Sequence, residues 1–407
     1  MPKGMVPAYG ALGLPLAFAA LPLYVHVPRY YAETTHLGLA LLGAILLGAR
    51  LFDAFVDPWL GWLADRLPHR RMLAMALLPF AIGFVALLNP PSSFVSLWLL
   101  ASLTLTYLGF SAASVAYQAW GVSLGGDSAE RTALTAAREG FGLVGVLLAA
   151  TLPSVLASSL SQGTQRLSWV LPPLLLIAAV PAFAKLGPGS SLPHSNEPLG
   201  QSLSRALRDT AFRRLLGVFI ANGIAAALPA TLFLFFVADV LGAASASGPL
   251  LAVYFVAGAA SMPLWVRLAA RFGRVRAWGL AMVLAMFAFA GAGLAGSGDI
   301  AGFALICLAS GLALGADLAL PAAIAADLGE RQGQAGICFG VWNFVAKLNL
   351  ALAAGLALPL LDRLGYRPGS AHNLSALTFA YALLPLGFKF VAATLLWRWR
   401  DSLEIHR

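Results

Sequence analysis

Residues 50–66 read RLFDAFVDPWLGWLADR, an apolar stretch with two acidic side chains in its middle. Its hydrophobicity is typical of a membrane helix. Asp53 and Asp57 are four residues apart, so both carboxylates lie on one face of that helix. Two like charges this close repel each other unless a cation or a proton lies between them. The stretch therefore predicts a membrane helix with a candidate site for Na⁺ or H⁺ at Asp53 and Asp57.

The composition of the whole chain predicts a membrane protein with many helices. Of its 407 residues 60% are hydrophobic and 11% are charged, and the mean hydropathy is +0.82, which is more apolar surface than a soluble protein of this size can cover. Each membrane helix needs about 20 mostly apolar residues, and the short alternating segments of a β-barrel do not occur. The predicted fold is all-α, with twelve membrane helices. They lie near residues 7–27, 37–63, 72–90, 94–123, 137–159, 168–184, 214–238, 247–270, 276–296, 300–326, 335–361 and 376–397.

The positive charges are distributed unevenly between the two ends of these helices. The net charge is +9, but with the N-terminus in the cytoplasm, 19 of the 26 Lys and Arg residues fall in cytoplasmic segments and 4 on the opposite side. Such a bias sets the orientation of a membrane protein and does not indicate nucleic-acid binding. We therefore expect an integral protein of the bacterial inner membrane, with both termini in the cytoplasm, contacts to membrane lipids and no nucleic-acid partner.

Two short segments of the first half of the chain recur in the second half. Residues 57–66 (DPWLGWLADR) align with 262–271 (MPLWVRLAAR), and residues 127–131 (DSAER) recur at 327–331 (DLGER), in the same order. Duplicated six-helix halves with a site at their interface are typical of secondary transporters. The predicted organisation is an N-terminal bundle at 1–184, a cytoplasmic linker with an amphipathic helix at 185–213, a C-terminal bundle at 214–398 and a cytoplasmic tail at 399–407.

The acidic pair occurs in the first half alone, because Asp53 and Asp57 align with Gly258 and Met262 in the second. The second half forms the corresponding helix without acids, so the pair is not needed to build the helix. Each charge near the membrane midplane costs roughly 2.5–3.5 kcal/mol, and ionisable groups kept there are candidates for function. The alternative is that Arg50 or Lys347 neutralises the pair for packing alone.

Three further charges are predicted inside the membrane, at Asp317, Lys347 and Lys389. Asp317 is either a solute contact or one half of a structural ion pair. Lys347 either faces the acidic pair or an anionic solute group in the same cavity, or it is the ion-pair partner of Asp317. Lys389 has no evident partner, and we expect its side chain to extend to the membrane surface.

Polar and aromatic side chains inside the predicted helices are candidates for lining a solute cavity. Aromatic faces suit a sugar ring or an acyl chain, although most aromatic residues of membrane helices serve packing. Enzyme chemistry is not indicated, because the six histidines lie near predicted helix ends or in loops and no glycine-rich phosphate loop with its lysine occurs. We expect no cofactor besides a coupling ion. The cavity candidates are Tyr117, Gln118, Trp120, Asn222, Trp342 and Asn343.

Three stretches resemble known carriers. GWLADRLPHRR at 61–71 is similar to the loop between helices 2 and 3 of the major facilitator superfamily. RLFDAFVDPWLGWLADR resembles the helix-2 signature of the glycoside–pentoside–hexuronide:cation symporters, the melibiose-carrier group, and AYQAWGVSLGGDSAERTALTAAR at 116–138 resembles that family's helix-4 to helix-5 segment. The resemblance implies the major facilitator fold, in which the first of these loops helps to lock a cytoplasmic gate. The corresponding gate residues are Gly61, Asp65, Arg66, Arg70 and Arg71.

The same resemblance implies roles for individual residues. The family's cation site falls on Asp53 and Asp57, with Ser111 as a hydroxyl ligand. Arg138 stands at the position of an arginine that contacts substrate, and Lys347 at that of a lysine tied to cation coupling. The resemblance therefore implies a symporter that works by alternating access and carries a small organic solute of sugar or glycoside type together with Na⁺ or H⁺. We expect it to act as a monomer.

Three positions depart from the melibiose carrier. Val56 stands where that carrier has an amide ligand, which weakens the case for Na⁺ and strengthens that for H⁺. Pro15 and Ser114 stand where it has sugar-binding acids. The helix-2 signature is also similar to that of sodium-coupled lysophospholipid carriers, so an amphipathic or anionic solute is an alternative. A proton-driven exporter is a second alternative, and a membrane sensor without transport is a third.

Overall fold

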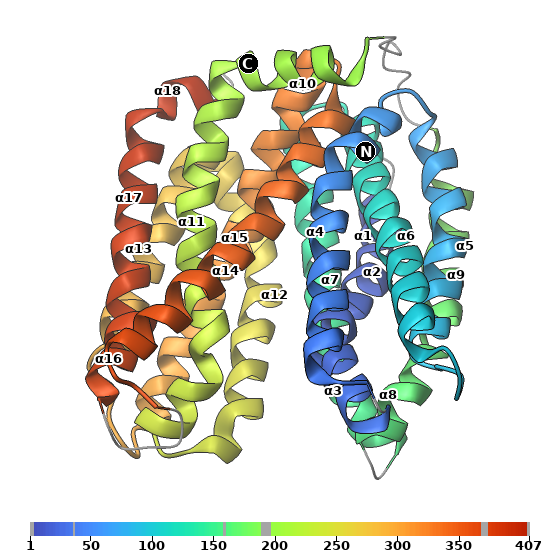
Figure 1. Ribbon diagram of the computed structural model, residues 1–407. Coiled ribbons are helices and arrows are strands. Elements are labelled where there is room, and N and C mark those ends of the chain that lie inside the picture. Colours follow the sequence, from blue (N-terminus) through green and yellow to red (C-terminus); the bar gives the residue numbers. More distant parts are fainter. Residues whose placement is uncertain (1–3, 36, 158–159, 189–196, 368–372, 405–407) are drawn as a thin grey trace. The chain divides into compact units, whose positions relative to one another are not determined.

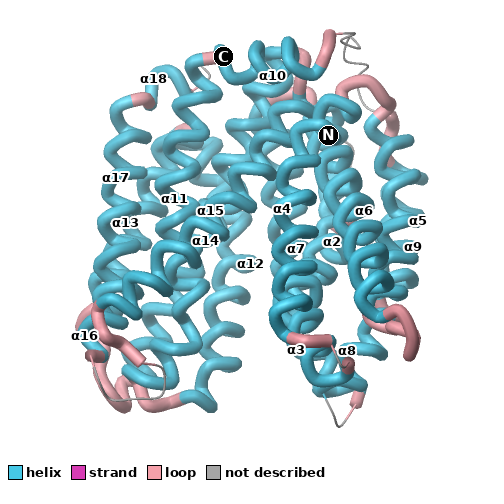
Figure 2. The backbone as a smooth tube through the Cα atoms, viewed as in Figure 1, coloured by secondary structure: helices cyan, strands magenta, loops and turns pink. Residues whose placement is uncertain are grey.

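The computed structural model describes residues 4–35, 37–157, 160–188, 197–367 and 373–404, which form helices joined by short loops (Figure 1). Figure 2 shows that no strand occurs among these residues. Parts of the expected linker and C-terminal tail, residues 189–196 and 405–407, lie outside the described residues. The all-α class predicted from the sequence is confirmed.

The chain forms two compact units, which are described separately. Unit 1 comprises Met1–Ala206 and Ala326–Phe344, and unit 2 comprises Leu207–Ala325 and Val345–Arg407. Unit 1 therefore holds the first half of the chain together with a short segment of the second half. In that segment the tenth predicted membrane helix ends and the eleventh begins, so residues of both repeats lie within unit 1.

The helices of unit 1 follow the predicted membrane segments, with one interruption. The first predicted helix, 7–27, is broken between Gly10 and Gly13, and a helical path then continues beyond it to Thr34. The unit contains α1 (Met5–Gly10), α2 (Gly13–Leu21), a π turn at Pro22–His26, α3 (Val27–Thr34), α4 (Leu39–Ala64), α5 (His69–Leu87), α6 (Val95–Leu124), α7 (Ser128–Leu156), α8 (Leu160–Ser168), α9 (Leu171–Lys185) and most of α10 (Leu199–Arg208).

α7 begins nine residues before the predicted start of its membrane segment, at 137. Its first turn is polar and is capped by Asp127, whose side chain accepts a hydrogen bond from a backbone N–H of that turn over 2.8 Å. Such a cap satisfies a backbone donor that the helix leaves open at its start. The additional turns place Arg138 and Glu139 about 15 Å from the beginning of the helix.

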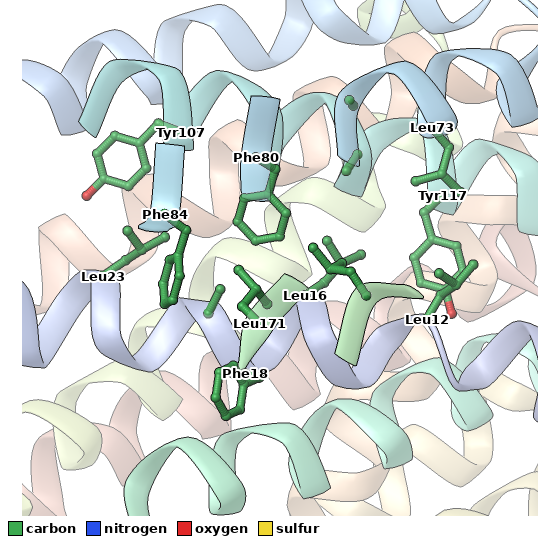
Figure 3. Close-up of a cluster of buried hydrophobic side chains, with 14 of the residues drawn as sticks. Leu12, Leu16, Phe18, Leu23, Leu73, Phe80, Phe84, Tyr107, Tyr117 and Leu171 are labelled. Atoms are coloured by element: carbon green, nitrogen blue, oxygen red, sulfur yellow. The ribbon is translucent and has the colours of Figure 1, made fainter. Parts of the chain in front are cut away.

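The core of unit 1 forms where α2, α5, α6 and α9 meet, as Figure 3 shows for side chains of these four helices. α5 and α6 cross closely because two glycines leave room. A Cβ added at Gly83 would lie 2.7 Å from the backbone nitrogen of Thr106, and one at Gly109 would lie 2.6 Å from that of Phe80. Small residues permit such close crossings in membranes. The crossing fixes α6, and with it Ser111, relative to the core.

Unit 2 has its own core, in which aromatic rings pack together. The ring of Phe236 stacks on that of Tyr381, with 4.1 Å between centroids, and on that of Phe303, with 5.3 Å. The unit contains α11 (Thr210–Phe235), a π turn at Phe236–Val240, a 3₁₀ turn at Ala244–Ala246, α12 (Ser247–Phe272), α13 (Arg274–Ala292), most of α14 (Ile300–Gln332), most of α15 (Ala335–Arg363), α16 (Leu374–Thr378), a π turn at Phe379–Leu383, α17 (Leu384–Arg398) and α18 (Arg400–Leu403).

Ten helices in the described part of the chain are long and apolar enough to cross a membrane. Two predicted membrane segments are not among these ten. The first is divided between α1 and α2, and the second, α4, carries Arg50, Asp53 and Asp57 in its middle. α4 is 26 residues long, which exceeds the about 20 residues that a bilayer requires.

Candidate functional site

Asp53 and Asp57 are both buried in unit 1, with 1% and 0% of their surface exposed. α4 packs on α6, and Oγ of Ser111, itself buried, donates a hydrogen bond to Asp53 Oδ1 over 2.6 Å. Arg50, one turn before Asp53 on the same helix, is exposed. The structure thus brings together the three residues that the resemblance assigns to a cation site. Their oxygen atoms are the kind of ligand that a hard cation prefers.

The beginning of α15 lies directly against the backbone of α4 in unit 1. A Cβ at Gly340 would lie 2.5 Å from the carbonyl oxygen of Asp57, and one at Gly336 would lie 2.3 Å from that of Gly61. Gly61, predicted as a gate residue, is therefore needed for the close approach of α15 to α4. Gly336 and Gly340 were not predicted, although two glycines four residues apart are a known signal for helix contact in membranes.

Asp65 follows α4 and caps the start of α15. Its two carboxylate oxygens accept hydrogen bonds from the backbone N–H groups of Gly336 over 2.6 Å and Ile337 over 2.8 Å. A negative charge is favoured at the N-terminus of a helix. Burial outweighs these bonds, however, and raises the pKa of Asp65 to about 7. This predicted gate residue thus links α4 to α15 within unit 1.

The raised pKa of Asp65 predicts that its contact with α15 weakens as the pH rises. When the contact opens, the side chain is hydrated and its pKa falls toward the ordinary value of 3.8, so the closed contact binds the proton more tightly. The contact should be most stable below about pH 4, lose stability up to about pH 7 and stay constant above. Hydrogen exchange of the Gly336 and Ile337 amides, corrected for intrinsic rates, checks this. Asp65→Asn should remove the pH dependence, and equal protection at all these pH values in the unaltered protein would contradict it.

The three arginines of the predicted gate loop have different surroundings. The Arg66 guanidinium lies 3.7 Å from the centre of the Trp62 ring and donates to the carbonyl oxygen of Glu197 over 2.5 Å. Arg70 donates to a main-chain carbonyl of α9 over 2.6 Å. Arg71 is exposed. Two of the three arginines therefore attach the loop to the linker and to α9 within unit 1.

An ionic cluster that the sequence analysis did not predict joins α7 to the end of α14. Arg131 contacts Asp327 through Nε over 2.5 Å and Glu330 over 2.6 Å, and Ser128 Oγ donates to the second Asp327 oxygen over 2.7 Å. All four residues belong to the two copies of the repeated segment. A signal was present, because each copy carries an arginine and two acids, so the arginine of one copy can pair with the acids of the other.

Arg138 is buried in unit 1 and is bound to its chain neighbour Glu139. Nε and one terminal nitrogen of Arg138 donate to Glu139 Oε1 over 3.0 and 2.6 Å. On the other side the backbone of α2 holds Arg138, because a Cβ at Gly13 would lie 2.4 Å from the Arg138 carbonyl oxygen. Glu139 was not predicted, since the predicted helix start at 137 placed it at the membrane boundary.

The remaining cavity candidates of unit 1 differ in their contacts. Tyr117 and Trp120 are fully buried. The Tyr117 hydroxyl donates to the Tyr9 carbonyl oxygen of α1 over 2.5 Å, and Trp120 Nε1 donates to the Gly187 carbonyl oxygen after α9 over 3.2 Å. Gln118 donates a hydrogen bond to Asn343 Oδ1 over 3.3 Å. Trp342, which precedes Asn343 in the sequence, is buried. Gln118 and Asn343 are therefore brought together, whereas Tyr117 and Trp120 belong to the core.

Asp317 and Asn222 lie in unit 2, where they contact Lys389. The Lys389 ammonium group forms an ion pair with Asp317 Oδ2 and donates to Asn222 Oδ1 over 2.7 Å, and Trp278 Nε1 donates to Asp317 Oδ1 over 2.8 Å. The expectation that Lys389 extends to the membrane surface is wrong, because it is 1% exposed and bonded to α11 and α14. Asp317 pairs with Lys389, and Lys347 of α15 is half-buried.

Comparison with known proteins identifies this architecture. Residues 7–400 match the family described as MFS/sugar transport protein. The chain belongs to this family. The protein is therefore an integral membrane transporter of the major facilitator superfamily and not an enzyme, and the family resemblance inferred from its sequence motifs is confirmed.

Individual proteins resemble this chain at low sequence identity. The uncharacterized symporter YnaJ of Bacillus subtilis (strain 168) is 28% identical over 169 residues, which span 38% of this chain and about a third, 36%, of that protein. The fucose:proton symporter FucP of E. coli aligns with a TM-score of 0.71 and 16% identity over 96% of this chain and 97% of that one. The human organic anion transporter MFSD10 aligns with a TM-score of 0.72 and 17% sequence identity. The alignment covers 97% of this chain and 100% of that one. These structural matches confirm the twelve-helix major facilitator fold.

Proposed function

We propose that this transporter is a cation-coupled symporter of a small organic solute, and that Asp53 and Asp57 bind the driving ion. The observation that carries the proposal is the burial of both carboxylates on one face of α4, with the Ser111 hydroxyl 2.6 Å from Asp53. Two buried carboxylates four residues apart repel each other, and a cation at the pair removes that repulsion. Membership of the MFS/sugar transport family and the similarity to a protein named as a symporter support it.

Coupling follows from differential affinity. A bound cation lowers the electrostatic cost of burying Asp53 and Asp57, so it favours the conformation in which both acids are enclosed. If the solute binds the same conformation more tightly, each ligand raises the affinity for the other. Alternating access then carries both across the membrane together.

The contacts at Asp65 and Arg131 are proposed to form the cytoplasmic gate. They attach α4 and α7 to the segment where α14 ends and α15 begins. Asp57 lies on α4 and Asp65 directly follows it; the two are eight residues apart, which is about 12 Å along the helix axis. Gly340 touches the backbone of α4 at Asp57, and Gly336 does so at Gly61, so the ion site and the gate share one helix–helix contact. Movement of α15 away from α4 would therefore change both the ion site and the gate.

The coupling ion is Na⁺ or H⁺, and one experiment both tests symport and names the ion. Solute uptake into proteoliposomes is measured under an imposed Na⁺ gradient and, separately, under an imposed pH gradient. Accumulation above the equilibrium level under one of the two gradients is expected. Uptake that stops at equilibrium under both would contradict symport. Extrusion of preloaded solute in exchange for protons would instead support the proton-driven exporter.

The solute is proposed to be of sugar or glycoside type, in keeping with the family. A lysophospholipid or another amphipathic or anionic solute is the second candidate. Arg138, buried in unit 1, has a positive charge that suits an anionic group, and Pro15 and Ser114 stand where the melibiose carrier has its sugar-binding acids. We propose that the carrier works as a monomer in the bacterial inner membrane with both termini in the cytoplasm. It needs no cofactor besides the coupling ion.

A further inference from the structure

Glu197 is a linker residue whose main chain is bonded to the end of α4. Its carbonyl oxygen accepts a hydrogen bond from Trp62 Nε1 over 2.9 Å and another from a terminal nitrogen of Arg66 over 2.5 Å. Trp62 lies in the last turn of α4, and Arg66 follows two residues after the helix ends. The linker is therefore attached at two points to the segment that carries the proposed cytoplasmic gate.

The side chain of Glu197 contacts the start of α15, on the other side of the same gate. Gln334, the residue before α15, donates a hydrogen bond from Nε2 to Glu197 Oε2 over 3.4 Å and is itself 1% exposed. Gln334 is followed closely by Gly336, whose N–H group is bonded to Asp65. Glu197 thus joins the end of α4 to the start of α15 alongside Asp65, and all these residues belong to unit 1.

The Glu197 carboxylate is oriented by α10, the amphipathic helix of the linker. Arg205, in the second turn of that helix, forms an ion pair with Oε1 of Glu197, which leaves Oε2 for Gln334. α10 begins two residues after Glu197 and buries the small side chains of Ser202 and Ala206 on one face. A side chain that is held in its bound orientation loses less entropy when it forms a contact.

We propose that Glu197 is a latch that holds the start of α15 against the end of α4, where we place the cytoplasmic gate. This inference rests on the proposed function, because it assigns a further positioning residue to that gate. A linker that needed only to be anchored would require one side of the contact, whereas Glu197 binds both. Separation of α15 from α4 has to break its bond to Gln334 or its bonds to Trp62 and Arg66. The linker therefore sets, together with Asp65, how often this contact opens.

Hydrogen exchange of the Gly336 and Ile337 amides in the purified full-length protein, without solute, measures how often the contact opens. It is recorded at one pH above about 7, where the Asp65 contact no longer changes with pH. Glu197→Ala removes both contacts of the carboxylate, so exchange at the two amides should become roughly 2- to 10-fold faster, the range expected for the loss of one hydrogen bond. Glu197→Gln keeps an oxygen for Gln334 and should give a smaller increase.

A double-variant cycle separates a latch from a merely structural role. Gln334→Met removes the donor while keeping the length of the side chain, and it should accelerate exchange about as much as Glu197→Ala. Because both variants break the same contact, combining them should give no further acceleration, whereas two independent effects would multiply. If Gln334→Met does not fold, Trp62→Phe takes its place, since it keeps a ring for Arg66 and removes one donor to Glu197. Its smaller effect should likewise vanish in the Glu197→Ala background.

The control is Asp401→Ala, which removes the acid of an exposed ion pair of 3.4 Å with Arg400 and should leave exchange at both amides unchanged. Unchanged exchange in Glu197→Ala with a normal midpoint of thermal unfolding would overturn the proposal. Effects of Glu197→Ala and Gln334→Met that multiply in the double variant would overturn it as well. Solute uptake by the same variants separates the latch from the proposed gate. Faster exchange with an unaltered uptake rate would support the latch and contradict the assignment of this contact to the gate.

Discussion

Replacing Asp57 by asparagine is expected to abolish gradient-driven accumulation of solute while the protein remains folded. The carboxamide has nearly the same size as the carboxylate, but it carries no negative charge to balance a cation and no proton that it can release. Coupling between two ligands typically amounts to about 5- to 150-fold in affinity, and the cation-dependent enhancement of solute affinity should disappear completely. Accumulation in proteoliposomes under the productive gradient measures the loss.

Asp53→Asn should give the same result, and its design preserves a local contact. The carboxamide oxygen can still accept the hydrogen bond that Ser111 donates to Asp53. Asp362→Asn is the control, because Asp362 is an exposed acid at the end of α15, and its replacement should leave accumulation unchanged. Thermal unfolding of each variant separates loss of coupling from loss of folding. Undiminished cation-dependent accumulation in Asp57→Asn would remove the acidic pair from the mechanism.

Breaking the ion pair between Asp317 and Lys389 is expected to cause a large loss of stability in unit 2. Lys389→Gln leaves the Asp317 carboxylate buried with the Trp278 N–H but without a positive charge. Removing one partner of a buried ion pair costs about 3–5 kcal/mol. The midpoint of thermal unfolding should therefore fall on the order of 10 °C for a unit of this size. Asp317→Asn should behave similarly, because it leaves the ammonium group buried.

Removing both charges together should restore most of that stability. A variant with Asp317→Asn and Lys389→Gln retains a donor for Asn222 and buries no uncompensated charge, and such neutral replacements are often as stable as the original pair. Arg400→Gln provides the comparison, since its exposed ion pair with Asp401 is worth at most about 1 kcal/mol. If the double variant unfolds at as low a temperature as the less stable of the two single variants, the two charges do not stabilise each other.

Hydrophobicity and local spacing account for much of what could be predicted. Runs of about 20 apolar residues locate membrane helices because the bilayer demands them. α4, predicted at 37–63, spans Leu39–Ala64 in the structure. The spacing of Asp53 and Asp57 determines their common face before any tertiary contact is known.

Other features depend on contacts between distant segments or on the ends of helices. The partners of Lys389 lie 72 and 167 residues away, and a single sequence does not show which helices are neighbours. Hydrophobicity locates the lipid-facing part of α7 and misses its polar first turns, so the predicted start at 137 lies nine residues after the start of the helix in the structure. Gly336 has no side chain, and its role is to let α15 approach the backbone of α4 closely.

The most direct test of the symport mechanism records cation entry when solute is added to proteoliposomes that contain either the unaltered protein or Asp57→Asn. We predict that a transported solute triggers entry of Na⁺ or H⁺ with the unaltered protein and that Asp57→Asn shows no such entry. Equal cation entry in both proteins, or solute entry without any cation in the unaltered protein, would contradict the assignment of Asp53 and Asp57 as the site of the driving ion.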